Sequence, residues 1–361
     1  MQPLKIGKYI IEKPIIQGGM GVGISWDKLA GTVSKEGGLG VISAVGTGYY
    51  EDKKYAKKLS RTGRPMETEN FYNGEATKVI IANARKISGD KPLATNILYA
   101  SSNYGEIVND VCQAGIDIII TGAGLPTNMP EFTKDYLDVA LIPIVSSAKA
   151  LKIICKRWKR YNKLPDAIIV EGPKSGGHQG FTYEQCTKDE YQLENILPSI
   201  IEEAKLWGDF PVIAAGGIWD KNDIENFLDI GCSGVQMATR FIGTFECDAH
   251  ENLKKVLLDA KEEDISLLKS PVGLPARGVL TNLQNSIKNG TAPKIVCASN
   301  CVSPCKRGVE AKEVGYCIAD CLSDAYNGKL DTGLFFTGSN GYKLTKLISV
   351  KELMDKLVNG E

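Results

Sequence analysis

Ile168-Ile-Val-Glu-Gly-Pro-Lys-Ser-Gly-Gly-His-Gln-Gly180 places a short β-branched apolar run directly before a glycine-rich turn that carries a histidine. An apolar run of this length is typical of a strand buried on both faces. Gly176 and Gly177 allow backbone angles and close approaches that a Cβ would forbid. His178 is one of only 2 histidines in 361 residues, and an imidazole suits proton transfer at neutral pH. The stretch therefore predicts a strand ending in an active-site loop; the alternative is a histidine that only fills the turn.

The composition excludes several classes of protein. The 43 Lys and Arg residues balance 43 Asp and Glu residues, which gives no electrostatic argument for binding nucleic acid or an anionic membrane. The first residues form no long apolar segment, and no window approaches the roughly 18 apolar residues of a membrane span. The 10 cysteines are expected to be free thiols in a reducing compartment. We therefore expect a cytoplasmic protein.

Strand-length apolar runs alternate with helical patterns along most of the chain. Eight strands are predicted, at 14–20, 39–45, 93–98, 117–121, 140–145, 167–171, 211–215 and 235–238. Such alternation requires right-handed crossovers and a parallel sheet, and eight units over about 240 residues match a (β/α)8 TIM barrel of the α/β class. A doubly wound open sheet is the alternative. The barrel is preferred because glycines and polar residues repeatedly follow the strands, and only a barrel gathers them at one mouth.

The pattern changes after Thr239. Residues 1–244 are predicted to form the barrel, and 245–315 a small, mostly helical second domain that caps its mouth and includes a cysteine-rich segment. Residues 316–361 are expected to return to the barrel.

A phosphate site is predicted after the last two strands. These strands end in Ala214-Ala-Gly-Gly-Ile218 and Gly234-Val-Gln-Met-Ala-Thr-Arg240. Backbone N–H groups at such turns bind anions, and Thr239 adds a hydroxyl. Two ordinary tight turns are the alternative. Asn96 stands on an otherwise apolar strand, where its amide could contact a heterocycle edge or satisfy a turn.

Five cysteines crowd together as Cys297, Cys301, Cys305, Cys317 and Cys321. Their spacing lacks the usual C-x2-C pairs and no histidine is near, so packing is preferred to a zinc or iron–sulfur site, and no metal ligand is assigned. Among the aromatic pairs, Phe335-Phe336 could line a pocket or lie in the core.

Six separated motifs, in order, resemble the nitronate monooxygenase (2-nitropropane dioxygenase) family. They are Gln17-Gly-Gly-Met20, Leu29-Ala-Gly-Thr-Val-Ser-Lys-Glu-Gly-Gly-Leu-Gly-Val41, Asn96, Gly176-Gly-His-Gln-Gly180, Ala215-Gly-Gly-Ile218 and Gln236-Met-Ala-Thr-Arg-Phe241. The resemblance implies a TIM barrel with one noncovalent FMN that oxidises alkyl nitronates with O2. It implies His178 as the catalytic histidine. The cofactor-binding positions that it implies are Gly19, Met20, Asn96, Glu171, Gly176, Gly177, Gly216, Gly217, Gln236, Met237, Ala238 and Thr239.

The chain departs from the family pattern beside the histidine. Glu171 stands where many nitronate monooxygenases are expected to have Gln, and the related flavin-dependent enoyl-acyl carrier protein reductases have Glu. An NAD(P)H-dependent reductase of an enoyl thioester or quinone is therefore the second hypothesis. A flavin-free phosphate-substrate lyase or isomerase and an iron–sulfur protein are more distant ones. A small-molecule substrate is expected in each enzymatic case, and a homodimer is the assembly considered.

Overall fold

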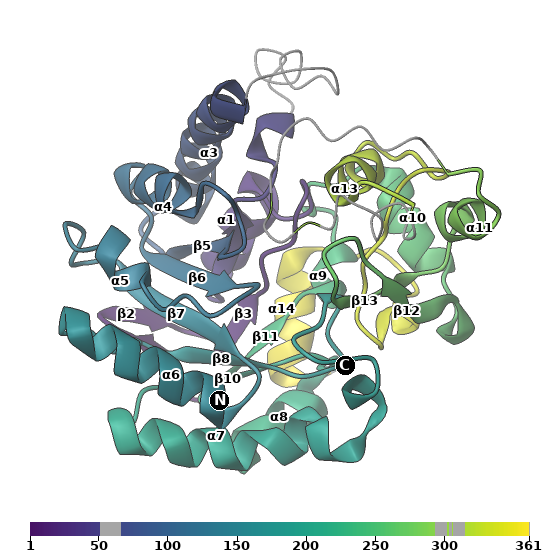
Figure 1. Cartoon of the computed structure of the whole chain (residues 1–361). Helices are drawn as coiled ribbons and strands as arrows, with labels where there is room; N and C mark the ends of the chain where they lie inside the picture. The colour runs from purple at the N-terminus through teal and green to yellow at the C-terminus, as the bar shows by residue number, and fades with distance from the viewer. Residues whose placement is uncertain (51–65, 293–301, 303–304, 306–314, 361) are drawn as a thin grey trace.

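The computed structural model of the chain contains a closed barrel of eight parallel strands (Figure 1). The structure describes residues 1–50, 66–292, 302, 305 and 315–360. The strands are β3 (Ile15–Gln17), β4 (Gly40–Ser43), β5 (Leu93–Leu98), β6 (Ile118–Gly122), β7 (Ala140–Val145), β8 (Ile168–Glu171), β10 (Val212–Ala215) and β11 (Gly234–Met237). All eight lie within a residue of the predicted ranges or inside them, so the predicted TIM barrel is confirmed.

The barrel closes between its first two strands, β3 and β4. The amide N–H of Gln17 donates to the carbonyl of Leu39 at 3.0 Å, and the N–H of Leu39 donates to the carbonyl of Ile15 at 3.0 Å. The fully buried side chain of Gln17 completes the seam, since its Oε1 accepts from the N–H of Val41 at 3.1 Å and its Nε2 donates to the Val41 carbonyl at 3.2 Å. One side-chain amide thus satisfies both the N–H and the carbonyl of Val41 at the seam between β3 and β4.

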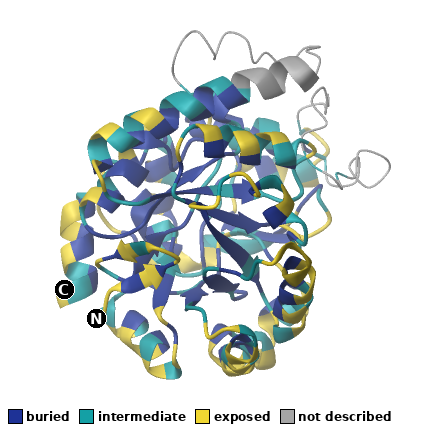
Figure 2. Ribbon diagram, turned by 90° about the vertical axis from the view of Figure 1, so that its left-hand side faces the viewer, coloured by how far each residue is buried: buried dark blue, intermediate teal, exposed yellow. Residues whose placement is uncertain are grey.

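Helices surround the strands, as the sequence pattern requires. They are α1 (Asp27–Lys35), α3 (Met66–Ser88), α4 (Tyr104–Gln113), α5 (Met129–Phe132), α6 (Ala148–Trp158), α7 (Leu193–Trp207), α8 (Lys221–Ile230) and α9 (Thr239–Ile242). Asp220 caps the start of α8, because its carboxylate accepts from the N–H of Asp223 at 3.1 Å in a capping box. Figure 2 shows buried residues throughout the strands and exposed ones on the outer faces of the helices. The largest apolar cluster lies between these layers.

The bottom of the barrel is closed by a hairpin that the sequence analysis did not predict. β1 (Leu4–Ile6) and β2 (Tyr9–Ile11) pair antiparallel around Gly7, whose φ of 56° suits a tight turn. Leu4, Ile6 and Ile11 are buried with the side chains of the barrel interior. Two three-residue strands are too short to show a clear period in the sequence.

After the barrel, the chain forms helices and a second, small sheet. The helices are α10 (Glu251–Asp259), α11 (Asn282–Lys288), α13 (Ile318–Tyr326) and α14 (Val350–Asn359). The sequence predicts a mostly helical cap, but the segment also contains the hairpin of β12 (Ile265–Lys269) and β13 (Pro275–Val279). This hairpin forms a three-stranded sheet with β9 (Gly177–His178). α14 returns to the barrel and packs against α1 and α8. The division at residues 244 and 315 stays a prediction. Within the described residues, no helix is long and apolar enough to cross a membrane.

Replacing the seam glutamine should weaken the whole fold. Gln17→Met keeps the volume but leaves the N–H and carbonyl of Val41 buried without partners, which should lower the free energy of unfolding by roughly 2–4 kcal/mol. The measurement is urea unfolding followed by circular dichroism. Gln113→Met, at an exposed position ending α4, is the control and should cost less than about 0.5 kcal/mol. Equal stability of the two variants would show that closure does not depend on this amide.

Candidate active site at the carboxyl ends of the strands

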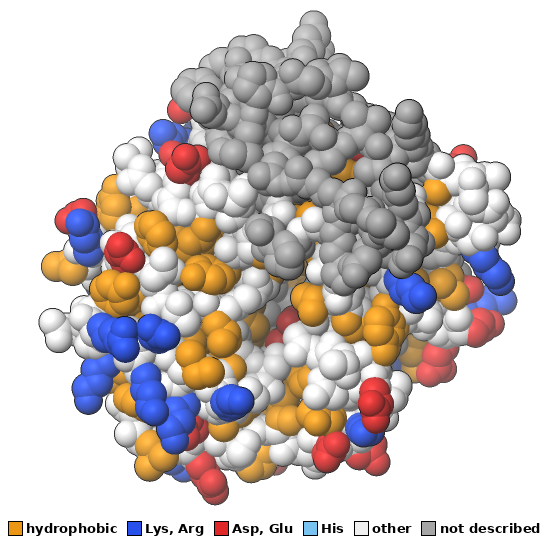
Figure 3. Space-filling view, viewed as in Figure 1, with side chains coloured by type: hydrophobic (Ala, Val, Ile, Leu, Met, Phe, Trp, Pro, Cys, Tyr) orange, Lys and Arg blue, Asp and Glu red, His pale blue; other side chains and the backbone are white. Residues whose placement is uncertain are grey.

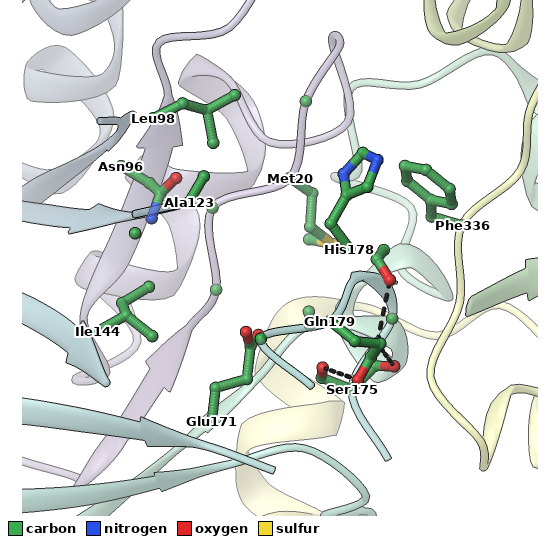
Figure 4. A pocket seen from close by; sticks show the side chains of 18 of the residues that line it. Met20, Asn96, Leu98, Ala123, Ile144, Glu171, Ser175, His178, Gln179 and Phe336 are labelled. Carbon is green, nitrogen blue, oxygen red and sulfur yellow. Dashed lines mark hydrogen bonds between the residues drawn. The ribbon is translucent and has the colours of Figure 1, made fainter. Parts of the chain in front are cut away.

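One large cavity opens at the carboxyl ends of the barrel strands, with a volume of about 1450 Å³. Figure 4 shows side chains from β5, β7 and β8, and Ala123 just after β6, on the other side of it from His178 and Phe336. The structure brings all the predicted site residues to its lining: Gly19, Met20, Asn96, Glu171, Gly176, Gly177, His178, Gly216, Gly217, Gln236, Met237, Ala238 and Thr239. Pockets for one drug-sized ligand usually measure roughly 300–1,000 Å³, so this cavity is larger than a single ligand of that size requires.

His178 is held at the cavity by the small sheet. Strand β9 pairs with β13, with His178 opposite Ala276, and the Nε2 of His178 lies 2.7 Å from the Oγ of Ser270. The imidazole packs edge-on against Phe336, with ring centroids 5.4 Å apart. Burial lowers the pKa of His178 from 6.5 to about 4, because the charged form loses its hydration. The ring is therefore neutral at neutral pH, with one nitrogen able to donate a hydrogen bond and the other able to accept one.

The glycine turn around His178 is fixed by a side chain that the sequence analysis missed. Gln179 is buried, and its Nε2 donates to the carbonyls of Ser175 at 2.8 Å and Gly177 at 3.0 Å. Gly177 has a φ of 75°, which an L side chain rarely adopts. At Gly176, a Cβ would lie 2.7 Å from the carbonyl carbon of Thr337. The turn therefore needs glycine at 177 for the backbone angle and at 176 because a side chain has no space there.

A backbone cradle follows β10 and β11, at the predicted phosphate position. Gly216 and Gly217 have φ values of 104° and 81°, which bend the chain sharply after β10. The hydroxyl of Thr239 accepts from the N–H of Gly338 at 2.8 Å, and the amide of Asn340 donates to the carbonyl of Gly217 at 2.7 Å. The loop with Gly338 and Asn340 comes from the distant C-terminal part of the chain. Only the tertiary fold could place it here.

Two polar side chains stand in register on the cavity floor. Glu171 of β8 and Gln236 of β11 both lie opposite Ala215 of the intervening strand β10. Burial raises the pKa of the Glu171 carboxyl to about 7, although a hydrogen bond with Ser175 opposes the shift. The Oε1 of Gln236 is buried and has no hydrogen-bond partner among the described residues. A buried acceptor without a partner is costly, so this floor fits a ligand that brings a donor.

The opposite wall depends on close contact between Gly19 and Asn96. Any Cβ at Gly19 would collide with the Cβ of Asn96, so glycine is required for the β3 loop to approach β5. The loop is anchored by the N–H of Met20, which donates to the Oγ of Ser25 at 2.8 Å. Asp248 accepts from the N–H groups of Trp26 at 2.8 Å and Leu29 at 3.2 Å, and so caps the start of α1. Asp248 was not singled out from the sequence.

The aromatic pair contributes one residue to the cavity, and the cysteine-rich segment is described only in part. Phe336 lines the cavity, whereas its neighbour Phe335 is buried in the core. Cys297 and Cys301 lie outside the described residues. Cys305, Cys317 and Cys321 lie among the described residues, and no cluster of three or more metal-ligating side chains occurs in that part of the chain.

The fold and the cavity place this chain among the (β/α)8 barrel enzymes, whose ligands bind where the strands end. The family model for nitronate monooxygenase matches residues 2–360, so the chain belongs to the nitronate monooxygenase family. It is therefore an oxidoreductase, and the members of its family are flavoproteins. Membership of this family favours an oxidoreductase over the lyase, isomerase and iron–sulfur hypotheses.

Individual relatives agree with the family. A probable nitronate monooxygenase of Staphylococcus haemolyticus is 25% identical over 294 residues, which cover 77% of this chain and 78% of the relative. One of Staphylococcus aureus is 27% identical over 288 residues, covering 74% and 76%.

Two solved structures share the fold. FabK from Thermotoga maritima has a TM-score of 0.72 at 24% identity, with 97% of this chain and 93% of that chain covered. Nitroalkane oxidase from Streptomyces ansochromogenes has a TM-score of 0.68 at 18% identity, with 97% and 96% covered.

The buried Glu171 should make stability depend on pH. Its pKa is about 7 in the folded protein against an ordinary 4.5, so its contribution is complete below pH 4.5 and is lost as the pH rises to about 7. In the flavin-free protein, Glu171→Gln should therefore gain stability over the wild type across this window, by at most about 3 kcal/mol. Urea unfolding at several pH values measures the difference. The lowered pKa of His178 has the opposite sign, but it is common to both proteins and cancels. A constant difference from pH 4.5 to 7 would contradict the shifted pKa.

Proposed function

We propose that this chain is an FMN-dependent nitronate monooxygenase, which oxidises alkyl nitronates with O2. The observation that carries the proposal is the convergence, on one cavity, of a neutral histidine and a glycine cradle in a chain whose whole length matches this family.

The cavity has features that suit FMN. The turn at Gly216 and Gly217, together with Thr239, would hold the phosphate through backbone N–H groups and a hydroxyl. The Oε1 of Gln236 needs a donor, which a ring N–H or a ribityl hydroxyl of FMN would provide. The lining residues assigned to the rest of the cofactor are Gly19, Met20, Asn96, Glu171, Gly176, Gly177, Met237 and Ala238.

His178 would contact the nitro group of the substrate. An alkyl nitronate has already lost its α-proton, so the neutral imidazole would act by donating a hydrogen bond to the anionic nitro group, and contact with Ser270 and Phe336 holds the ring in one orientation. FMN, when bound, would supply the electron-transfer chemistry to O2. The part of the protein is to position the substrate and the histidine together and to exclude water from the buried floor.

An NAD(P)H-dependent reductase of an enoyl thioester or quinone is the second candidate. Glu171 favours it, because the related reductases that the sequence resembles have Glu at this position and many nitronate monooxygenases are expected to have Gln. With a pKa of about 7, this carboxyl could also donate a hydrogen bond or a proton near neutrality.

The phosphate cradle gives a direct test of cofactor binding. Gly217→Ala adds a Cβ that would lie 2.9 Å from the Cβ of Lys174, at a φ of 81°, and should weaken FMN affinity at least about tenfold. Fluorescence titration of the flavin-free protein measures the affinity. Gly89→Ala is the matched control, because Gly89 also has a positive φ, of 65°, but its Cβ would meet nothing within 4 Å. Unchanged affinity in Gly217→Ala would place the phosphate elsewhere.

The histidine gives a test of the reaction. When FMN-loaded protein is mixed anaerobically with an alkyl nitronate, the flavin absorbance should bleach rapidly in the wild type. In His178→Ala it should bleach roughly 10²–10³-fold more slowly while FMN stays bound, because the anionic nitro group loses a hydrogen bond.

Two outcomes of this stopped-flow experiment would overturn the proposal. Bleaching by NAD(P)H without any response to nitronate would establish the reductase instead. Wild-type rates in His178→Ala would return this histidine to a structural role.

A further inference from the structure

Ser270, which contacts the imidazole, lies in a buried chain of hydrogen bonds. It is 5% exposed and directly follows β12, and its Oγ is 2.7 Å from the Nε2 of His178. The N–H of Val272 donates to the same Oγ at 3.4 Å, as is common for a serine two residues earlier in a turn. Next to Ser270, the Oη of the buried Tyr316 donates to the carbonyl of Lys269 at 2.8 Å. The hydrogen of Tyr316 is therefore already used, and the Ser270 hydroxyl needs an acceptor for its own.

Two acceptors lie within reach of the Ser270 hydroxyl, the Nε2 of His178 and the Oη of Tyr316. Burial raises the pKa of Tyr316, and a hydrogen bond with Ser270 opposes the shift. The lone pair of a neutral imidazole nitrogen is localised, whereas that of a phenol oxygen is shared with its ring, so the nitrogen is the stronger acceptor. Hydroxyl donors form bonds of about 2.7–2.8 Å to oxygen, and N–H donors bonds of about 2.9–3.0 Å. The separation of 2.7 Å between Oγ and Nε2 therefore fits a hydroxyl that donates to the ring.

The other ring nitrogen, Nδ1, is left for a ligand. His178 lines the cavity and Ser270 does not. Figure 4 shows one ring nitrogen of His178 on the side that faces Asn96. Phe336 packs against the ring, and Figure 3 shows hydrophobic side chains on both sides of the hollow at the centre of this face. Among the residues that the structure describes, only Ser270 forms a hydrogen bond with the imidazole, so this bond decides which nitrogen carries the hydrogen of the neutral ring.

We propose that Ser270 is a positioning residue, whose hydroxyl donates to the Nε2 of His178 and so keeps the hydrogen of the ring on Nδ1, directed into the cavity. This inference rests on the proposed function only for the role of that N–H, which would donate to the anionic nitro group of the substrate. The second histidine should have the opposite tautomer, because the Nδ1 of His250 accepts from the N–H of Asn252 at 3.0 Å. His250 therefore carries its hydrogen on Nε2 and serves as a reference within the same chain.

Nitrogen-15 NMR of the FMN-loaded protein tests the proposal, because the chain has only 2 histidines. The protein is made with histidine labelled with nitrogen-15, and His250→Gln assigns the signals. The measurement is made at about pH 8.5, well above the ordinary histidine pKa of about 6.5. Ring nitrogens with and without a hydrogen differ widely in chemical shift. We expect the hydrogen on Nδ1 in His178 and on Nε2 in His250.

Variants of Ser270 test the cause of the tautomer. Ser270→Ala removes the donor, so the ring of His178 should return toward the Nε2–H tautomer that histidine favours in water, while the signals of His250 stay unchanged. With an alkyl nitronate under anaerobic conditions, the flavin of this variant should bleach about two- to tenfold more slowly. Ser270→Thr keeps the hydroxyl and should restore both the tautomer and the rate. Ser266→Ala is the matched control, since Ser266 lies on β12 and is absent from the cavity lining.

The outcomes separate the tautomer from the reaction. A hydrogen on the Nε2 of His178 in the wild type would overturn the proposal, and would mean that Ser270 donates to Tyr316 instead. An unchanged tautomer in Ser270→Ala would also overturn it. A hydrogen on Nδ1 that Ser270→Ala displaces would support it, even in a protein that fails to oxidise nitronates. That failure would contradict the proposed function alone.

Discussion

Closure of the barrel between β3 and β4 is the constraint on which the site depends. Parallel strands in a closed ring have their carboxyl ends at one mouth, and the buried amide of Gln17 satisfies the backbone where the ring joins. Residues from distant parts of the chain, such as Gly19, Asn96 and Thr239, thereby line a single cavity. An open sheet of the same strands would leave its first and last strands far apart.

The second constraint is the small sheet over the mouth. Strand β9 is only two residues long, and its pairing with β13 fixes the backbone of His178 while Ser270 fixes the ring. Gln179 holds the turn from inside. The histidine is thus positioned by β12 and β13, which follow the barrel strands in the chain, so this later segment is part of the site.

Burial disfavours the charged forms of two titratable groups of this site. It lowers the pKa of His178 to about 4 and raises that of Glu171 to about 7. At pH 7 the imidazole is therefore neutral and the Glu171 carboxyl is about half protonated, near the unpartnered oxygen of Gln236. Such an environment suits a polar, uncharged ring system and strengthens each hydrogen bond made to it.

The sequence alone determined the barrel, its eight strands and the residues at their ends, because buried parallel strands leave continuous apolar runs and the functional glycines follow them directly. It also singled out His178 and the cradle at Gly216 and Gly217. Only the tertiary structure decided that Ser270, Phe336, Gly338 and Asn340 join this site, since contacts over such separations leave no local period. It also decided the two pKa shifts, because burial of a charged group depends on every element packed around it.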